Sequence, residues 1–222
     1  MAMMRTYGDG CGIAHALDLL GERWALLVVR ELLLGPKRYT DLREGLPNVS
    51  PNVLAQRLRE LEQAAIVQRR KLPPPAASWI YELTDWGRDL KPIMLSIGAW
   101  AVRSPAFTRE APVGTDSVIL GLSTFFDGEA AADLDARYEL RLGEHPFHVR
   151  VADGAIELGR GPSDGPDAVV ETDVDTLRAL IWDARDLDEA LRAGDVTIDG
   201  DRHAVARLLG LFPQPRPVAT PR

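Results

Sequence analysis

The chain has 222 residues and a formal net charge of −7, and its 45% hydrophobic and 27% charged residues are typical of a globular protein rather than a disordered or fibrous one. No apolar run approaches the roughly 18 residues of a membrane span. No basic region precedes an apolar stretch near the start of the sequence, as it would in a secretory signal peptide. The single cysteine, Cys11, excludes an intrachain disulfide and a Cys-rich zinc module. We therefore expect a cytoplasmic protein that does not insert into membranes and needs no metal or cofactor.

The charge is unevenly distributed along the chain. Residues 1–110 contain 15 Lys and Arg against 12 Asp and Glu, a net of +3, whereas residues 111–222 contain 11 against 21, a net of −10. Overall acidity argues against a nucleic-acid partner, but two halves of opposite sign indicate two domains with different partners.

The first half predicts five helices and a hairpin. Apolar residues at helical spacing indicate helices over residues 13–20 and 24–34, and Thr40 is a candidate N-cap for a short helix over 41–46. Ser50 followed by Pro51 marks the start of a helix that runs to about residue 63. Strands are predicted at 66–71 and 79–83, around a proline turn, and a longer helix at 85–102. This order is that of a winged helix-turn-helix domain, which we place at residues 1–104.

The helix that starts at Pro51 has two different faces. Leu54, Leu58 and Leu61 share one side, and polar residues occupy the other, the division that a DNA recognition helix requires. Asn and Gln can pair bidentately with adenine, Arg reaches guanine or phosphate, and exposed helix N–H groups suit a phosphate. An ordinary solvated face is the alternative. The candidate DNA-binding residues are Lys37, Arg38, Ser50, Asn52, Gln56, Arg57, Arg59, Arg69 and Arg70.

Several motifs in residues 8–102 resemble those of the HxlR-type transcription regulators. They are Leu19-Leu20-Gly21-x-Arg23-Trp24, Gly35-Pro36-x-Arg38-Tyr39, Ser50-Pro51-x-Val53-Leu54, Arg57-Leu58-x-Glu60-Leu61-Glu62 and Tyr81-x-Leu83-Thr84-x-x-Gly87. The resemblance implies a homodimer whose two recognition helices enter successive major grooves of an imperfect palindrome in double-stranded DNA. One departure is the wing tip, residues 72–78, which is proline-rich and uncharged.

The helix predicted at 85–102 has an apolar stripe that either packs on its own domain or forms a dimer surface. The resemblance favours the dimer surface, with the candidate residues Trp86, Leu90, Ile93, Met94, Ile97 and Trp100.

Cys11 is a candidate redox sensor because some relatives of the family sense oxidants through an N-terminal cysteine. Its place near the start of a helix would lower its pKa, but the nearest basic residue in sequence is Arg5. An inert thiol is the alternative.

The second half predicts an α+β domain at residues 115–212. Helices are expected at 116–126, 174–184, 187–192 and 202–211, and strands at 138–142, 147–151, 155–158, 168–171 and 196–199. The result is a mostly antiparallel sheet with helices on one face. Four prolines in the last ten residues predict a disordered tail at 213–222.

This half is similar to the sterol carrier protein type-2 fold, most specifically in the segment 194–201, Gly-Asp-Val-Thr-Ile-Asp-Gly-Asp. The resemblance implies an apolar cavity for a hydrophobic small molecule or lipid between sheet and helices. A filled core is the alternative. The candidate cavity residues are Tyr138, Leu140, Phe147, Val149, Ile156, Leu180, Ile181, Val196, Leu208 and Phe212.

No catalytic motif is visible, and the four histidines show no metal-like pairing. The sequence therefore predicts a homodimeric DNA-binding transcription regulator whose second domain binds a hydrophobic molecule and modulates operator binding. One alternative keeps the DNA-binding half but makes the second domain a ligand-free spacer or dimerisation module, with Cys11 or nothing as the sensor. A lipid carrier with a vestigial helix-turn-helix is a further alternative.

Overall fold

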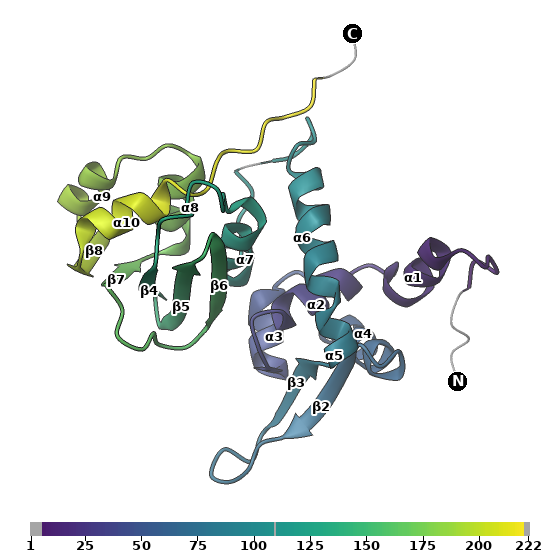
Figure 1. Cartoon of the computed structure of the whole chain (residues 1–222). Coiled ribbons are helices and arrows are strands. Elements are labelled where there is room, and N and C mark those ends of the chain that lie inside the picture. The colour runs from purple at the N-terminus through teal and green to yellow at the C-terminus, as the bar shows by residue number, and fades with distance from the viewer. Residues whose placement is uncertain (1–5, 109, 220–222) are drawn as a thin grey trace. The chain divides into compact units, whose positions relative to one another are not determined.

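The computed structural model describes residues 6–108 and 110–219, and the chain divides into two compact units, Met1–Met94 and Leu95–Arg222 (Figure 1). Each unit has its own sheet and its own helices. The division falls inside a helix, ahead of residue 104, the predicted end of the first domain. The mixed α+β class predicted from the sequence is confirmed.

The helices of the first unit surround one apolar core. They are α1 (Gly12–Leu20), α2 (Ala25–Leu32), α3 (Tyr39–Gly45) and α4 (Pro51–Gln63). Buried aliphatic side chains of α2, α3 and α4 meet in one cluster with Ile66 and Val67, and Leu42 and Leu54 are completely inaccessible. From α1, Leu19 and Leu20 pack against this cluster and are partly buried. The α3 helix starts before the predicted cap at Thr40, because the Asp41 carboxylate accepts the Arg38 N–H at 2.9 Å and fixes the first turn there.

The sheet of the first unit has three strands in the order β1-β3-β2. The strands β2 (Val67–Lys71) and β3 (Trp79–Leu83) form the predicted antiparallel hairpin. The strand β1 (Lys37–Arg38), which was not predicted, has two residues and pairs with Tyr81 and Ile80 of β3. Two residues are too short for a visible alternation, so only the tertiary pairing identifies this strand.

Two helices replace the single helix predicted at 85–102: α5 (Asp85–Arg88) and α6 (Leu90–Ala101). The Thr84 hydroxyl caps α5 by accepting the Gly87 N–H at 3.0 Å. A Cβ on Gly87 would lie 2.1 Å from the Ile66 carbonyl oxygen, so this position requires glycine. Pro92 has no N–H to donate to the preceding turn, and a proline fits the first turn of a new helix. The break between α5 and α6 follows from that residue.

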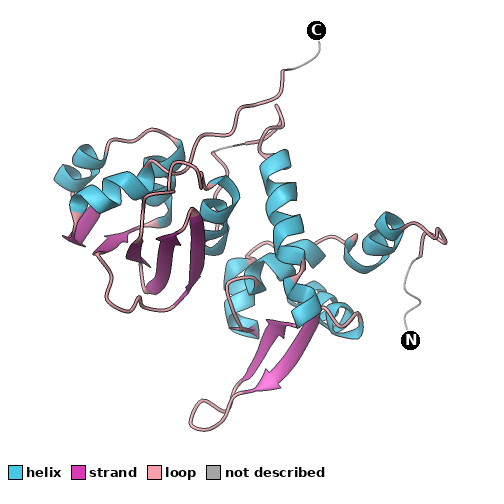
Figure 2. Ribbon diagram, viewed as in Figure 1, coloured by secondary structure: helices cyan, strands magenta, loops and turns pink. Residues whose placement is uncertain are grey.

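The second unit is a five-stranded sheet with helices packed on it (Figure 2). Its strands are β4 (Ala136–Leu142), β5 (His145–Ala152), β6 (Ala155–Arg160), β7 (Ala168–Thr172) and β8 (Val196–Gly200), in the order β6-β5-β4-β7-β8. Only the β4–β7 pair is parallel. The helices α7 (Thr115–Phe125), α8 (Val174–Trp182), α9 (Leu187–Ala193) and α10 (Arg202–Leu209) share an apolar interior with β4 and β7.

The segment 194–201, which carried the most specific sequence pattern of this half, holds three residues with local structural roles. Gly194 ends α9 in the left-handed region at φ 79°. A Cβ on Gly200 would lie 2.3 Å from the Asp167 carbonyl oxygen. The Asp201 carboxylate caps α10 by accepting the N–H groups of His203 and Ala204. These residues therefore have local structural roles.

The segment 213–219, predicted as disordered, is hydrogen-bonded to its own unit. The Gln214 side-chain amide donates to the Trp182 carbonyl at 2.5 Å, and the Val218 N–H donates to the Arg103 carbonyl at 2.9 Å. The rest of the predicted tail, residues 220–222, lies outside the described residues. Among residues 6–108 and 110–219, no helix is both long and apolar enough to span a membrane.

Candidate nucleic-acid interface

The α4 helix presents a polar face to solvent from a fixed position. Leu54, Leu58 and Leu61 are at most 1% exposed, whereas Asn52 and Gln56 on the other side are exposed. Burial of three leucines stabilises this orientation by several kcal/mol, at about 1.5–3 kcal/mol for each side chain. The helix can therefore enter a groove without losing its contacts with the core.

The N-terminus of α4 is fixed by two side chains. The Ser50 hydroxyl accepts the Val53 N–H at 3.4 Å, so Ser50 is the N-cap of α4, as predicted. The Tyr39 hydroxyl donates to the Pro51 carbonyl at 2.8 Å and ties α3 to α4. The tyrosine contact was not anticipated from the sequence, because only the fold brings these two positions together.

Two of the predicted DNA contacts are buried and need correction. The Lys37 side chain is 7% exposed, and its Nζ lies 2.5 Å from a Glu31 carboxylate oxygen. The Arg57 side chain is 9% exposed, and its Nη1 lies 2.5 Å from Glu60 Oε2 and 3.6 Å from Glu22 Oε2. A buried cation in an ion pair stabilises the fold and cannot reach a phosphate. We therefore remove Lys37 and Arg57 from the candidate DNA-binding residues. Arg38 and Arg59 remain exposed.

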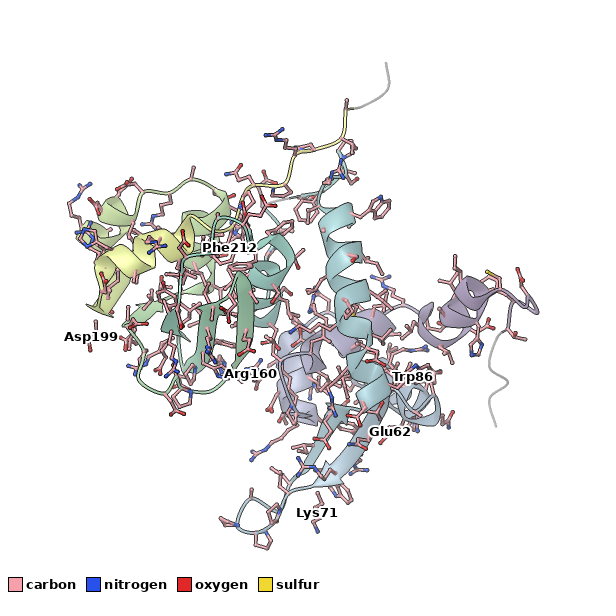
Figure 3. All side chains as sticks on the ribbon, viewed as in Figure 1. Glu62, Lys71, Trp86, Arg160, Asp199 and Phe212 are labelled. Carbon is pink, nitrogen blue, oxygen red and sulfur yellow. The ribbon has the colours of Figure 1, made fainter. Side chains whose placement is uncertain are left out.

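The base of the wing is basic and ordered by its own neighbours. The Arg69 guanidinium lies 4.2 Å from the centre of the Trp79 ring, a cation–π contact across the hairpin. Arg70 is paired with Glu82 at 3.1 Å, which raises the pKa of Arg70 and lowers that of Glu82. Lys71 follows at the end of β2 (Figure 3). The exposed tip beyond it, residues 73–77, carries only Pro and Ala.

The predicted dimer stripe divides between two environments. Leu90 and Met94 pack partly against the core of the first unit and keep an intermediate exposure. Trp86, Ile93, Ile97 and Trp100 are exposed, from 46% at Ile97 to 76% at Trp100. Ile93, Ile97 and Trp100 follow the spacing of one helix face on α6. Large apolar side chains exposed together in this way indicate a contact surface.

Cys11 is exposed at the N-terminus of α1. The backbone N–H groups of Ala14 and then Ile13 lower the pKa of its thiol. The carboxylate of Asp9 accepts the Cys11 N–H at 2.9 Å. A thiol in this position is accessible to a reagent and more often ionised than an ordinary cysteine.

The interior of the second unit is almost filled. The space between sheet and helices has a volume of about 10 Å³, close to the minimum for one water molecule. Of the ten predicted cavity residues, Leu140, Leu180, Ile181, Leu208 and Phe212 line it. The other predicted residues Tyr138, Phe147, Val149 and Val196 are buried elsewhere in the core, and Ile156 is only half-buried. The space is also lined by residues that were not predicted: Leu122, Val170, Leu177, Leu187, Val205 and Leu209.

Tyr138 shows why a core position can resemble a cavity position in sequence. Its side chain is inaccessible to solvent, and its hydroxyl donates to the Ala204 carbonyl at 3.0 Å. Burial raises the pKa of this tyrosine to about 12. A satisfied, neutral hydroxyl that joins β4 to α10 is a structural feature.

Among the described residues, no cluster of three or more His, Cys, Asp or Glu side chains could hold a metal ion.

The helices, the capped α4 and the hairpin define the first unit as a winged helix-turn-helix protein. The HxlR-like helix-turn-helix model matches residues 19–106. The transcriptional regulator YodB of Bacillus subtilis is 43% identical over 86 residues, which cover 39% of this chain and 77% of YodB. The chain therefore belongs to the HxlR-like helix-turn-helix family, as the sequence motifs indicated.

The chain is also similar to solved structures of YodB. The reduced form is 37% identical and covers 47% of this chain and 100% of YodB, with a TM-score of 0.39. The quinone-bound form is 39% identical over 40% of this chain and 93% of YodB, with a TM-score of 0.36. The second half matches a different model, that of the alkyl sulfatase C-terminal domain, at residues 113–218. The resemblance to sterol carrier protein type-2 is not confirmed.

Proposed function

We propose that the protein is a homodimeric transcription regulator that binds double-stranded DNA through α4. The observation that carries the proposal is the exposed polar face of α4, with Asn52, Gln56 and Arg59 opposite a buried leucine face. Its relatives are HTH-type transcriptional regulators. As a regulator of transcription it would act in the cytoplasm of a bacterium.

Each side chain of this interface has a role that follows from its chemistry. Asn52 and Gln56 lie in the first half of α4 and suit bidentate pairing with adenine. Arg59, Arg38 and the N–H groups near Ser50 suit phosphate, and Arg69 and Arg70 suit the backbone beside the wing. Two copies of α4 would occupy successive major grooves, so the operator should be an imperfect palindrome.

The dimer would be formed by the exposed apolar side chains of α5 and α6. Trp86, Ile93, Ile97 and Trp100 are exposed in the single chain. Burial of such residues against a second copy would remove them from water and set the distance between the two recognition helices.

We further propose that the second unit binds a hydrophobic molecule by opening its apolar interior. The space there is too small for such a ligand in the present structure, because ligand sites have volumes of roughly 300–1,000 Å³. Binding therefore requires a second conformation, and the ligand changes DNA affinity only by its different affinity for the two states. The C-terminal segment supports communication between this interior and α6. It continues from Phe212, which lines the interior, to Val218, whose N–H donates to the Arg103 carbonyl just after α6.

A second candidate for the signal is Cys11, in which case the second unit is a filled spacer or dimerisation module. The exposed thiol with its lowered pKa favours this alternative, as does the filled interior. The relative YodB has been described in a quinone-bound form. In this chain an electrophile could add to Cys11, or two copies could form a disulfide in the presence of an oxidant.

The experiment that tests DNA binding is selection of duplexes from a random pool, followed by footprinting of the selected site. We expect protection of two half-sites about one helical turn apart. Repeating the footprint with a cellular lipid extract, and with a quinone on the parent and on Cys11→Ser, separates the two signals. A pool with no enriched sequence would contradict the proposed function.

A further inference from the structure

The amide group of Gln56 is hydrogen-bonded to a neighbour on the same helix. Its Nε2 donates to Glu60 Oε1 at 3.0 Å, between residues one turn apart on α4. A glutamine amide can present either its oxygen or its nitrogen to a base, and only the correct orientation gives two hydrogen bonds to adenine. A bond from Nε2 to Glu60 fixes that orientation and leaves the amide oxygen and the second N–H for the base.

The second oxygen of the same carboxylate is held from the protein interior. Arg57 Nη1 lies 2.5 Å from Glu60 Oε2, and the Arg57 side chain is only 9% exposed. Arg57 also lies 3.6 Å from Glu22 in the turn between α1 and α2. The carboxylate therefore has one oxygen on a buried cation and the other on the exposed glutamine.

We infer that Glu60 is a positioning residue that sets the base preference of Gln56, and that Arg57 holds Glu60 in place. The inference rests on the proposed function, because it assumes that Gln56 faces a base in the major groove. It assigns to Arg57 an indirect role in place of the direct DNA contact predicted from the sequence. Glu60 itself needs no contact with DNA.

The negative charge of Glu60 has to be balanced by a cation if its carboxylate is to stay near DNA. An unpaired carboxylate on the DNA-facing helix would be repelled by phosphates and would turn away from the groove. The Arg57 guanidinium neutralises it from the interior side and keeps it under Gln56. Glu60 should therefore improve discrimination between bases while slightly weakening binding to DNA of any sequence.

The alternative is an ordinary pair on a helix surface, which stabilises the helix and has no effect on recognition. The two roles give different results in a double-mutant cycle. The four proteins are the parent, Gln56→Ala, Glu60→Ala and the double variant. Glu62→Ala is the matched control, because it removes the same charge from the same helix but lies about 200° around it from Glu60.

The probe is a duplex selected from a random pool by the parent protein. Affinity is measured for this duplex, for versions with each adenine of the half-site replaced in turn, and for an unrelated duplex. For Glu60→Ala we expect a loss of about three- to tenfold in adenine preference at one position, the size of one partly exposed hydrogen bond to a charged group. Binding to the unrelated duplex should be unchanged or tighter. Glu60→Gln, which keeps an acceptor oxygen, should recover most of the preference.

The decisive result is the double variant. If Glu60 acts through Gln56, Glu60→Ala has no further effect on base preference once Gln56 is alanine. Additive effects, or an equal loss in Glu62→Ala, would overturn the inference and leave DNA binding by α4 intact. If Gln56→Ala keeps the full preference, direct reading by Gln56 is wrong and the inference falls with it. Failure to select any duplex would instead contradict the proposed function itself.

Discussion

Replacement of Lys37 by methionine separates a structural role from a DNA contact. Lys37 and Glu31 are 7% and 2% exposed, with 2.5 Å between their charged atoms. Removal of one partner of a buried ion pair typically costs about 3–5 kcal/mol. Glu31 keeps a second cation, because Arg30 Nη2 lies 2.7 Å from its other oxygen. We therefore expect Lys37→Met to lower the free energy of unfolding of the first unit by about 2–4 kcal/mol, a large part of the roughly 5–15 kcal/mol of a typical domain.

The matched control is Arg38→Met at the next position, where the side chain is exposed. Denaturant unfolding measures stability, and fluorescence anisotropy with a labelled duplex at several salt concentrations measures the salt slope. Each lost phosphate contact reduces the slope of log K against log salt by about 0.9. Arg38→Met should show that reduction at nearly unchanged stability, and Lys37→Met the reverse. If Lys37→Met retains full stability and loses salt slope, the reasoning from burial is wrong.

Three further predictions concern the dimer surface, the thiol and acid stability. Ile97→Glu should turn the dimer into a monomer in light scattering without loss of helix content, because Ile97 is 46% exposed in the single chain; a persistent dimer would contradict the proposed surface. Because backbone N–H groups lower the pKa of Cys11, its alkylation by iodoacetamide should reach half of its maximal rate at a lower pH in the folded protein than in the same protein unfolded in guanidinium, which is the control. The Ser163 N–H and Arg141 lower the pKa of Glu139, so the stability that this carboxylate provides is present above its unfolded pKa of about 4.3 and is lost as pH falls through the lower folded value. Glu139→Gln should therefore be less stable than the parent at pH 7, with a difference that shrinks towards pH 3 in thermal unfolding.

Local signals in the sequence were sufficient for most elements of the fold. Ser50 before Pro51 located the start of α4, and alternating residues located the β2–β3 hairpin. Each of these signals lies within a few residues of the element that it specifies. The β1 strand and the Tyr39–Pro51 contact have no such signal, because they depend on pairing between segments distant in sequence.

The sequence pattern located the exposed polar face of α4, but it did not show which of the candidate cations are buried. Lys37 and Arg57 occupy positions that a helical or loop pattern assigns to the surface, yet both side chains are buried. Long basic side chains carry an apolar stem that can lie within the protein when an acidic partner is present. The partners Glu31 and Glu60 were visible in the sequence, but the burial that makes these pairs structural became visible only in the fold.

The interior of the second unit limits the class of ligand that it can accept. Every residue around the present space of about 10 Å³ is apolar, so a charged or strongly polar ligand would lose its hydration without compensation. Opening the interior exposes apolar area at about 25 cal/mol per Å², and only a ligand that covers that area again can offset the cost. We therefore expect native mass spectrometry of the purified protein to show an apolar molecule released on unfolding, and saturating amounts of such a molecule to change DNA affinity. A bare chain mass, together with DNA affinity that is insensitive to fatty acids of 8–16 carbons, would assign this unit a spacer or dimerisation role and leave Cys11 as the remaining candidate sensor.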